Sequence, residues 1–287
     1  MKLTEVFNRE KPSFSFEVFP PKTSDKYESV KTATEEIAKL NPSYMSVTYG
    51  AGGGTSEYTV SIAENLLQNF GVTPLAHLTC VSSTKQAVKN QLEVLKSSGI
   101  ENILALRGDI PKEHSDPSTW SYHYASELIA DIKSSGDFCI GAACYPEGHP
   151  ESPNIKVDIE NLKRKVDAGC DFLTTQMFFD NNIFYNFLYR IREAGIDVPV
   201  VAGIMPITSA NYIKRTKELS GNFLPPKFVR IVDRYSENPA AMKQAGIAYA
   251  TEQVIDLFAN GIKAVHIYTM NKPDVAEKIQ SNLSEII

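Results

Sequence analysis

The chain has 287 residues, of which 43% are hydrophobic and 22% are charged, and its formal net charge is −5. This is the composition of an ordinary globular protein. Lysine and arginine form no basic patch, and no apolar run reaches the length of a membrane span. The sequence therefore predicts neither a nucleic-acid partner nor a membrane partner.

The N-terminus and the cysteines bear on the compartment of the protein. The opening stretch MKLTEVFNREK has no apolar core of a signal peptide. The four cysteines form no Cys-x-x-Cys pair and show no zinc spacing, and three of them lie in or beside apolar runs. These patterns favour buried, reduced thiols in a cytoplasmic protein.

Short apolar runs alternate with amphipathic stretches along the whole chain. Eight runs have the character of strands, namely 13–19, 44–49, 74–80, 102–107, 139–145, 171–178, 199–205 and 264–270. Helical patterns lie at 26–40, 57–70, 84–98, 121–134, 155–168, 181–194 and 209–220, with room for two helices in 221–262 and a last helix at 273–285.

Eight strand–helix units without a repeated linker predict one α/β domain over residues 1–287, a (β/α)8 TIM barrel. The alternative is an open doubly wound sheet. That fold usually has fewer strands, and no strand here is followed by the G-x-G-x-x-G pattern of its dinucleotide-binding form.

The first strand, in the stretch SFSFEVFPPKT, contains a carboxylate among apolar residues. Side chains alternate in a strand, so Phe14, Phe16 and Val18 face one side while Ser15 and Glu17 face the other. A carboxylate buried in this way costs free energy unless it is used. We therefore expect Glu17 to point into the mouth of the barrel, where active sites of this fold lie.

Other strands carry polar residues on one parity near their C-terminal ends. In the fourth strand, Arg107 and Asp109 share the parity of Ala105, opposite to Leu104 and Leu106. We expect the polar set to meet Glu17 in the barrel mouth; its members are Thr48, His77, Arg107, Asp109, Tyr145 and Gln176.

Several of these residues suggest chemistry. Glu17 and Asp109 are candidates for acid–base work, although Asp109 could equally be paired with Arg107. Arg107 with Gly108 suits a phosphate, and so does the glycine-rich loop 50–54, for which a tight or closing loop is an equal alternative. No metal site is expected, because His77 and His149 lack the spacing of metal ligands.

A helix face after the fifth strand carries Asp158, Asn161 and Lys165 at i, i+3 and i+7. Such a face is either solvated or lines a cofactor groove, and the local sequence does not decide between them.

Taken together, nine segments resemble the methylenetetrahydrofolate reductase family and cover nearly the whole chain in order. They are SFEVFPPKT (15–23), SVTYGAGG (46–53), HLTC (77–80), NILALRGDIP (102–111), AACYPEGHPES (142–152), NLKRKVDAG (161–169), TQMFFDN (175–181), GIMPI (203–207) and HIYTMNK (266–272).

The resemblance implies an FAD-dependent barrel enzyme of one-carbon metabolism. NADH or NADPH would reduce tightly bound FAD, which would then reduce 5,10-methylenetetrahydrofolate to 5-methyltetrahydrofolate in a ping-pong scheme that feeds methionine synthesis. Because relatives are oligomeric, the resemblance also implies a homo-oligomer. The longer members' regulatory domain is not expected here.

Site residues follow from the resemblance by position. Glu17 matches the family's general acid, Asp109 the aspartate beside flavin and pterin, and Gln176 a residue that contacts folate and nicotinamide. Positions that match FAD contacts are Thr48, His77, Arg107, Gly108, Asp109, Ala125, Tyr145, His149, Asp158, Asn161 and Lys165. On the folate side, Tyr212 and Lys272 replace the Gln and Arg of bacterial members.

Other functions remain open at this stage. They are a flavin-free pterin-binding methyltransferase on the same fold, a flavin-containing electron-transfer subunit or inactive scaffold, and, more remotely, a proline dehydrogenase-like barrel. The flavin-matching set counts against the first, and Glu17, Asp109 and Gln176 count against loss of activity.

Overall fold

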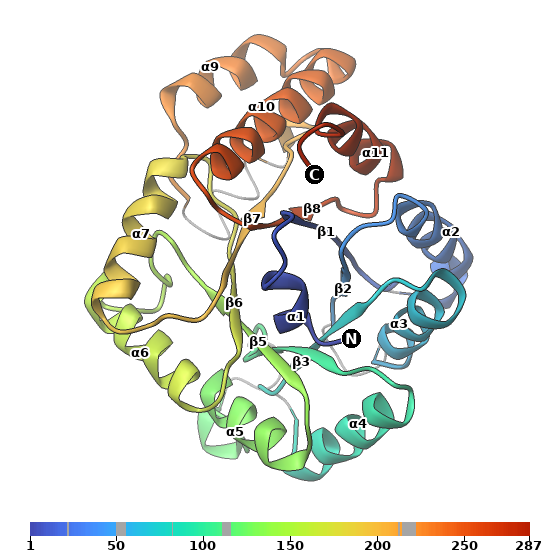
Figure 1. The fold of residues 1–287 in the computed structure, drawn as a ribbon, viewed down its shortest axis with the longest axis vertical. Helices are drawn as coiled ribbons and strands as arrows, with labels where there is room; N and C mark the ends of the chain where they lie inside the picture. Colours follow the sequence, from blue (N-terminus) through green and yellow to red (C-terminus); the bar gives the residue numbers. More distant parts are fainter. Residues whose placement is uncertain (22, 50–55, 82, 111–115, 212, 214–221) are drawn as a thin grey trace.

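The computed structural model describes residues 1–21, 23–49, 56–81, 83–110, 116–211, 213 and 222–287 as a closed parallel barrel (Figure 1). The strands follow in chain order and the last pairs with the first. They are β1 (Ser13–Val18), β2 (Met45–Val47), β3 (Pro74–Thr79), β4 (Asn102–Leu106), β5 (Cys139–Cys144), β6 (Phe172–Thr175), β7 (Val200–Ile204) and β8 (Ala264–Tyr268). The predicted (β/α)8 TIM barrel is confirmed.

Helices form an outer ring around the strands (Figure 1). They are α2 (Tyr27–Ala38), α3 (Ser56–Phe70), α4 (Lys85–Ser97), α5 (Ala125–Ser135), α6 (Ile155–Asp167), α7 (Asn181–Glu193), α9 (Pro226–Tyr235), α10 (Pro239–Ala259) and α11 (Pro273–Asn282), with short 3-10 turns η1 (Ser24–Lys26) and η3 (Pro117–Thr119). The two helices expected within 221–262 are α9 and α10. The helix expected at 209–220 lies mostly outside the described residues.

All eight predicted strands are present, but each ends earlier than the corresponding apolar run. The run 171–178, for example, contains the strand Phe172–Thr175 only. Beyond the strand, Met177 is partly buried and Phe178 is fully buried in the core between strands and helices. Apolar side chains thus continue past the last paired residue, which made the runs look longer than the strands.

The larger core lies between the strands and the helices. Phe14, Phe16 and Val18 of β1 lie in it and are at most 3% exposed, as their parity predicted. A parallel sheet covered by helices buries this face along its whole length, which explains the strongly apolar strands.

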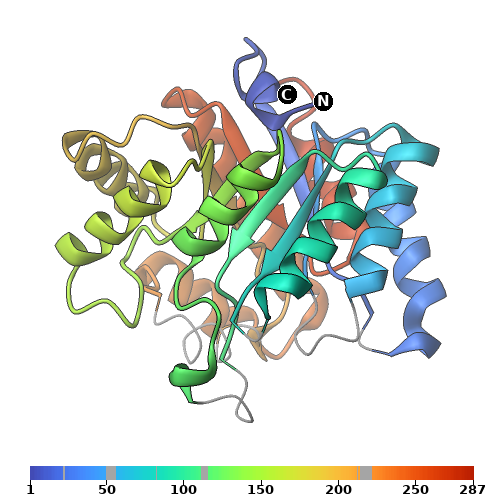
Figure 2. The same cartoon turned by 90° about the horizontal axis from the view of Figure 1, so that it is seen from below.

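The N-terminal end of the barrel is closed by a short helix that the sequence analysis did not predict, α1 (Leu3–Phe7). Figure 2 shows α1 and both chain ends at this end of the barrel. Phe7 packs on Phe172 of β6, with ring centroids 5.1 Å apart. Gly141 of β5 leaves the space for that ring, since a Cβ there would lie 2.4 Å from Phe172 Cζ. Phe7, Phe172 and the apolar side chains packed with them therefore form an apolar floor that closes the N-terminal end of the barrel.

The predictions about thiols are also tested by the structure. All four cysteines are free and buried, as expected. Among the described residues, no helix combines the length and apolar character needed to cross a bilayer.

Candidate active site

A cavity of about 510 Å³ lies at the C-terminal ends of the strands. Its volume is within the range of small-molecule sites. Six residues expected in the barrel mouth line it together: Glu17, Thr48, His77, Asp109, Tyr145 and Gln176. Glu17 lies in β1, and the other five lie in β2 to β6 or directly after these strands. The barrel therefore assembles the site from distant parts of the sequence.

Glu17 is held in the cavity wall by the register of three strands. It lies opposite Ser46 of β2 and Tyr268 of β8. About a fifth (19%) of the Glu17 side chain is exposed, so the carboxyl group has little contact with water. Burial raises the pKa of Glu17 to about 8. The carboxyl group therefore keeps its proton at neutral pH, as a general acid must.

His77 of β3 faces Glu17 without a hydrogen bond. Its Nε2 lies 3.7 Å from Glu17 Oε2, and within the described structure this buried nitrogen has no hydrogen-bond partner. Burial lowers the pKa of His77 to about 3, so the ring is neutral. A neutral imidazole offers Glu17 no charge, and its free nitrogen is available to a ligand in the cavity.

Asp109 reaches the cavity by a different route from the one predicted. In β4 the cavity is lined by Leu104 and Leu106, whereas Ala105 lies in the outer core. The predicted parity of this strand was therefore wrong. Gly108 follows with φ +87°, a left-handed conformation that turns the chain and brings Asp109 back to the mouth.

Arg107, which was expected with Asp109, is not among the residues that line the cavity. Its guanidinium binds the carboxylate of Glu151 through two hydrogen bonds of 2.6 and 2.7 Å. The alternative pairing of Arg107 with Asp109 does not occur as a direct contact in the structure. On the same rim, the rings of Tyr145 and His149 meet edge to face at 4.6 Å. Arg107 and His149 thus lie beside the cavity, next to Tyr145.

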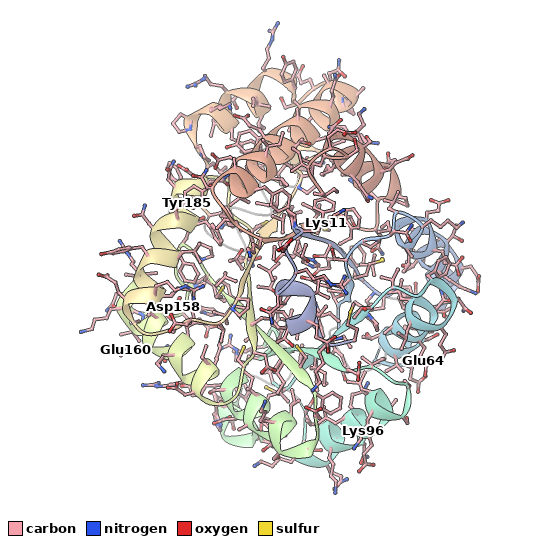
Figure 3. All side chains as sticks on the ribbon, viewed as in Figure 1. Lys11, Glu64, Lys96, Asp158, Glu160 and Tyr185 are labelled. Carbon is pink, nitrogen blue, oxygen red and sulfur yellow. The ribbon has the colours of Figure 1, made fainter. Side chains whose placement is uncertain are left out.

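The residues of the predicted α6 face make different contacts. Lys165 reaches inward, and its Nζ donates to the carbonyl oxygen of Ala143, a residue of the cavity wall, at 2.9 Å. Burial lowers the pKa of Lys165. Asp158 accepts a hydrogen bond from Ser152 at 2.8 Å, and Figure 3 shows its side chain in the outer ring. The face borders the cavity through its lysine.

The remaining predicted residues lie farther from the cavity or outside the description. Asn161 accepts a hydrogen bond from Arg164, and Ala125 is buried at the start of α5. Lys272 Nζ donates to Thr208 Oγ1 at 2.8 Å and does not line the cavity. Tyr212 and the glycine-rich loop 50–54 are outside the described residues.

Comparison with known proteins bears on what this cavity does. A family model described as methylenetetrahydrofolate reductase matches residues 2–284. The chain belongs to this family. The resemblance carried by the nine sequence segments is thereby confirmed.

Relatives with this name come from bacteria and plants. The 5,10-methylenetetrahydrofolate reductase of Pectobacterium carotovorum is 35% identical over 265 residues, which are 92% of this chain and 88% of the relative. The Escherichia coli K12 enzyme of the same name is 34% identical with the same coverage. "Methylenetetrahydrofolate reductase (NADH) 1" of Arabidopsis thaliana is 35% identical, but the match covers 99% of this chain and only 50% of that protein.

A solved structure supports the fold alone. It is that of a Clostridium thermocellum protein said to bind two copies of 5-methyl-5,6,7,8-tetrahydrofolic acid. Its TM-score is 0.71 over the full length of both chains, at 14% sequence identity.

Membership of the family, and not this likeness of fold, assigns the oxidoreductase reaction: reduction of methylenetetrahydrofolate.

Several other side chains line the wall of this reductase-family site and were not among the predicted site residues. They are Ser46, Thr175, Met177, Met205, His266, Tyr268 and Met270. Ser46, His266 and Tyr268 share the inward parity of Thr48, so alternation in β2 and β8 could have identified them. The methionines gave no signal, because an apolar residue at a strand end looks like core.

Metal binding has no support in the described residues, where no three His, Cys, Asp or Glu side chains gather as a possible metal site. The polar groups of the cavity are instead spread around its wall. This arrangement suits an extended organic ligand.

Proposed function

We propose that this protein is a flavin-dependent reductase that converts 5,10-methylenetetrahydrofolate to 5-methyltetrahydrofolate, with NADH or NADPH as electron donor in a ping-pong scheme. One observation carries the proposal. A carboxyl group with a pKa raised to about 8 by burial lies in the cavity wall, at the position that matches the family's general acid.

The names of substrate and product fix what the acid must do. The substrate carries a methylene carbon between N5 and N10, while the product carries a methyl group on N5. The bond from this carbon to N10 therefore breaks with its electron pair left on N10, and N10 gains a proton. Glu17 holds a proton at neutral pH and would donate it there. The carbon then remains on N5 as an iminium, ready to accept a hydride.

FAD, when bound, supplies that hydride after taking one from the nicotinamide. The residues present fit such a cofactor. Lys165 is an inward-reaching ammonium that makes no ion pair with a carboxylate in the part of the chain that the structure describes, and His77 has a buried free nitrogen. Phosphates and a polar ring would satisfy these groups.

The chain's candidates for holding FAD are those that matched by position. They are Thr48, His77, Arg107, Gly108, Asp109, Ala125, Tyr145, His149, Asp158, Asn161 and Lys165. Arg107 would have to share its guanidinium between Glu151 and a phosphate, or exchange one for the other.

Substrate contacts are proposed for Glu17, Asp109, Gln176, Tyr212 and Lys272. Asp109 and Gln176 line the cavity with Glu17, which supports their place beside the pterin ring. Asp109→Asn should weaken folate binding and raise the flavin potential, because it removes a negative charge. An unchanged affinity and potential would remove Asp109 from the site.

The proposal includes a cytoplasmic location and a homo-oligomer, with residues 1–287 acting as one FAD-binding catalytic domain. The closed barrel that the described residues form supports the single-domain proposal. Light scattering of the purified protein measures the oligomeric state. A monomer at micromolar concentration would contradict the proposed homo-oligomer.

The decisive experiment is an anaerobic half-reaction followed by visible absorption. A yellow protein that bleaches with NADH or NADPH and recovers its colour with methylenetetrahydrofolate supports the proposal and names the donor. Bleaching by another reductant only would favour an electron-transfer subunit. A colourless protein that FAD cannot reconstitute would overturn the proposal and favour a flavin-free pterin barrel.

A further inference from the structure

The turn that follows β8 lies beside the cavity and has an uncommon backbone. Lys272 N donates to the carbonyl oxygen of Thr269 at 3.2 Å, which closes a four-residue turn over 269–272. Its two central residues both have positive φ, 56° at Met270 and 53° at Asn271. Positive φ at both central positions is the pattern of a type I′ turn, in which glycine, asparagine and aspartate dominate. Asparagine suits such a turn, but methionine does not.

Met270 nevertheless lies where a ligand would meet it. Its side chain lines the cavity, and it packs against the apolar cluster that contains Phe179, Met205 and Ile207. A long side chain in the left-handed region raises the free energy of the folded state, so surrounding contacts must hold the backbone there. Those contacts come from the residues on either side of Met270.

Asn271 contacts the segment that follows β1. Its Oδ1 accepts a hydrogen bond from the backbone N–H of Phe19 at 3.0 Å, and its Nδ2 donates to the carbonyl oxygen of the same residue at 2.9 Å. A backbone N–H can only donate and a carbonyl can only accept, so these partners fix the orientation of the amide. The Asn271 side chain therefore satisfies both backbone groups of Phe19.

The contacts of this turn extend the pairing of β8 with β1 beyond the last paired residues. The backbone ladder ends where Glu17 lies opposite Tyr268. Thr269, which is 1% exposed, then donates its hydroxyl to the carbonyl oxygen of Glu17 at 2.8 Å. Two residues further along each chain, Asn271 binds Phe19. Side chains thus replace backbone groups in joining the two strand ends.

The segment that Asn271 binds is stiff. Pro20 and Pro21 follow Phe19, and both are buried. Each proline fixes its own φ, and Pro20 also restricts Phe19 to extended conformations. A turn that is bound to such a segment has a fixed backbone. The direction in which the Met270 side chain leaves the backbone is fixed with it.

We propose that Asn271 is a positioning residue that clamps the turn after β8 to the end of β1 and thereby holds Met270 in the cavity wall. Asn271 itself does not line the cavity, so it acts through Met270. A thioether packs favourably against an aromatic heterocycle such as a pterin ring. The inference rests on the proposed function for the identity of the ligand, which would be the folate.

A simpler role for Asn271 would be to supply a residue that tolerates positive φ. Asn41 has that simpler role. It follows α2 with φ 51°, it is exposed, and its backbone N–H donates to the carbonyl oxygen of Ala38. Among the described residues, its side-chain amide makes no hydrogen bond. The two asparagines therefore share a backbone conformation and differ in the contacts of the amide.

Glycine replacements separate the two roles. Glycine adopts positive φ without steric cost, so Asn271→Gly keeps the backbone preference of the turn and removes the clamp. Asn41→Gly is the matched control, because there the amide has no contact to lose. A role limited to backbone conformation predicts that both variants behave like the parent. The clamp predicts that only Asn271→Gly changes the cavity wall.

The first readout is the methyl signal of Met270 in protein labelled with ¹³C-methyl methionine, recorded without ligand. Met270→Leu identifies the signal. We expect it to shift in Asn271→Gly and to keep its position in Asn41→Gly. The methyl signal of Met45, which is fully buried in the outer core, should keep its position in both variants. An unmoved Met270 signal in Asn271→Gly would overturn the proposal.

The second readout is the affinity of the flavin-loaded protein for 5-methyltetrahydrofolate, measured by calorimetry. We expect Asn271→Gly to bind it about tenfold more weakly, the equivalent of one good contact between a thioether and a ring. Asn41→Gly should bind it like the parent. Met270→Ala should lose a similar factor, and the double variant should lose no more than either single one, because the clamp acts through Met270. Additive losses would overturn the proposal.

Asn271→Asp is the second variant, needed if the glycine variant does not fold. Aspartate tolerates positive φ and keeps an acceptor for the N–H of Phe19, but it places a second oxygen against the Phe19 carbonyl in place of a donor. We expect the Met270 signal to shift and the affinity to fall in this variant as well. Parental values in Asn271→Asp would overturn the proposal.

Failure of this inference is distinguishable from failure of the proposed function. If the parent protein reduces the folate but Asn271→Gly keeps the parental signal and affinity, the clamp is refuted and the function stands. If the Met270 signal shifts as expected but the parent protein binds neither flavin nor folate, the clamp stands and the function is refuted.

Discussion

The two ends of the barrel are built from the same strands but differ in the polarity of the side chains that they enclose. At the N-terminal end, Phe7, Phe172 and their neighbours form an apolar floor beneath α1. At the C-terminal end, the polar side chains of Glu17 and His77 are 19% and 7% exposed, and His77 Nε2 has no hydrogen-bond partner among the described residues. The floor stabilises the fold, while the mouth retains polar groups that cost stability.

The boundary between the ends lies within β1 itself. Ser15 and Glu17 share one face of the strand, two residues apart, but Ser15 has all its bonds inside the protein and Glu17 faces a cavity. Two neighbouring inward positions of one strand therefore have a structural and a functional role. Variants at the C-terminal end of the barrel should change activity, and variants at the N-terminal end should change the free energy of unfolding.

Glu17→Gln should have the largest effect on activity. The amide cannot donate an acidic proton to N10, so we expect folate reduction to fall by about a thousandfold or more. Flavin binding and its bleaching by NAD(P)H should persist, which stopped-flow absorption of the two half-reactions measures. Turnover at the parental rate would show that this end of the barrel does not supply the acid.

Phe172→Ala should have the largest effect on stability. Removing a fully buried ring from the floor should lower the free energy of unfolding by about 3–5 kcal/mol, as denaturant titration measures. Tyr189→Ala is the control, because Tyr189 is 66% exposed, and it should change stability by less than about 0.5 kcal/mol. Equal losses in the two variants would contradict a stabilising floor.

Lys165→Met tests the rim of the mouth. Loss of the inward-reaching ammonium should weaken FAD binding about 10- to 100-fold, because a charge-assisted contact is lost. Fluorescence titration of the flavin-free protein measures this affinity. Lys163→Met on the same helix removes an ion pair with Asp167 and should leave the affinity unchanged. Equal affinities in both variants would place the phosphates elsewhere.

The stability cost of the mouth should appear as a pH dependence. Glu17 keeps its proton up to pH about 8 when folded but loses it near 4.5 when unfolded. The unfolded state thus binds fewer protons between these values, and stability falls as pH rises. His77 and His266 act in the opposite sense, but only below pH 6.5.

Between pH 6.5 and 8, Glu17 is therefore the one of these three groups that contributes. The parent protein should lose about 2 kcal/mol relative to Glu17→Gln over this range, as paired denaturant titrations can measure. Parallel stability curves would show that Glu17 ionises as freely when folded as when unfolded.

The sequence predicted the fold well, because each strand is an apolar run and each helix is amphipathic. It also predicted that Glu17, His77 and Tyr145 would meet, because their parity and place at strand ends are local features. β4 defeated the parity rule, since Gly108 turns the chain after the strand has ended. The helix α1 was missed because five residues carry too little periodicity.

Pair contacts were beyond the reach of the sequence. Nothing local indicates that Arg107 meets Glu151, or that His266 is held between hydroxyls from two other strands. Such contacts depend on barrel register, which residues far apart in the chain fix together.

Tyr268 crosses its neighbour β7 to donate to the carbonyl oxygen of Thr175 in β6, at 2.6 Å. The crossing needs Gly203, where a Cβ would lie 2.4 Å from that oxygen and 2.5 Å from the tyrosine hydroxyl. Three strands are thereby tied into one wall that tolerates no added atom at its centre. An engineer who wishes to reshape the cavity for a new substrate should leave that wall alone and begin opposite it, at Leu106 of β4.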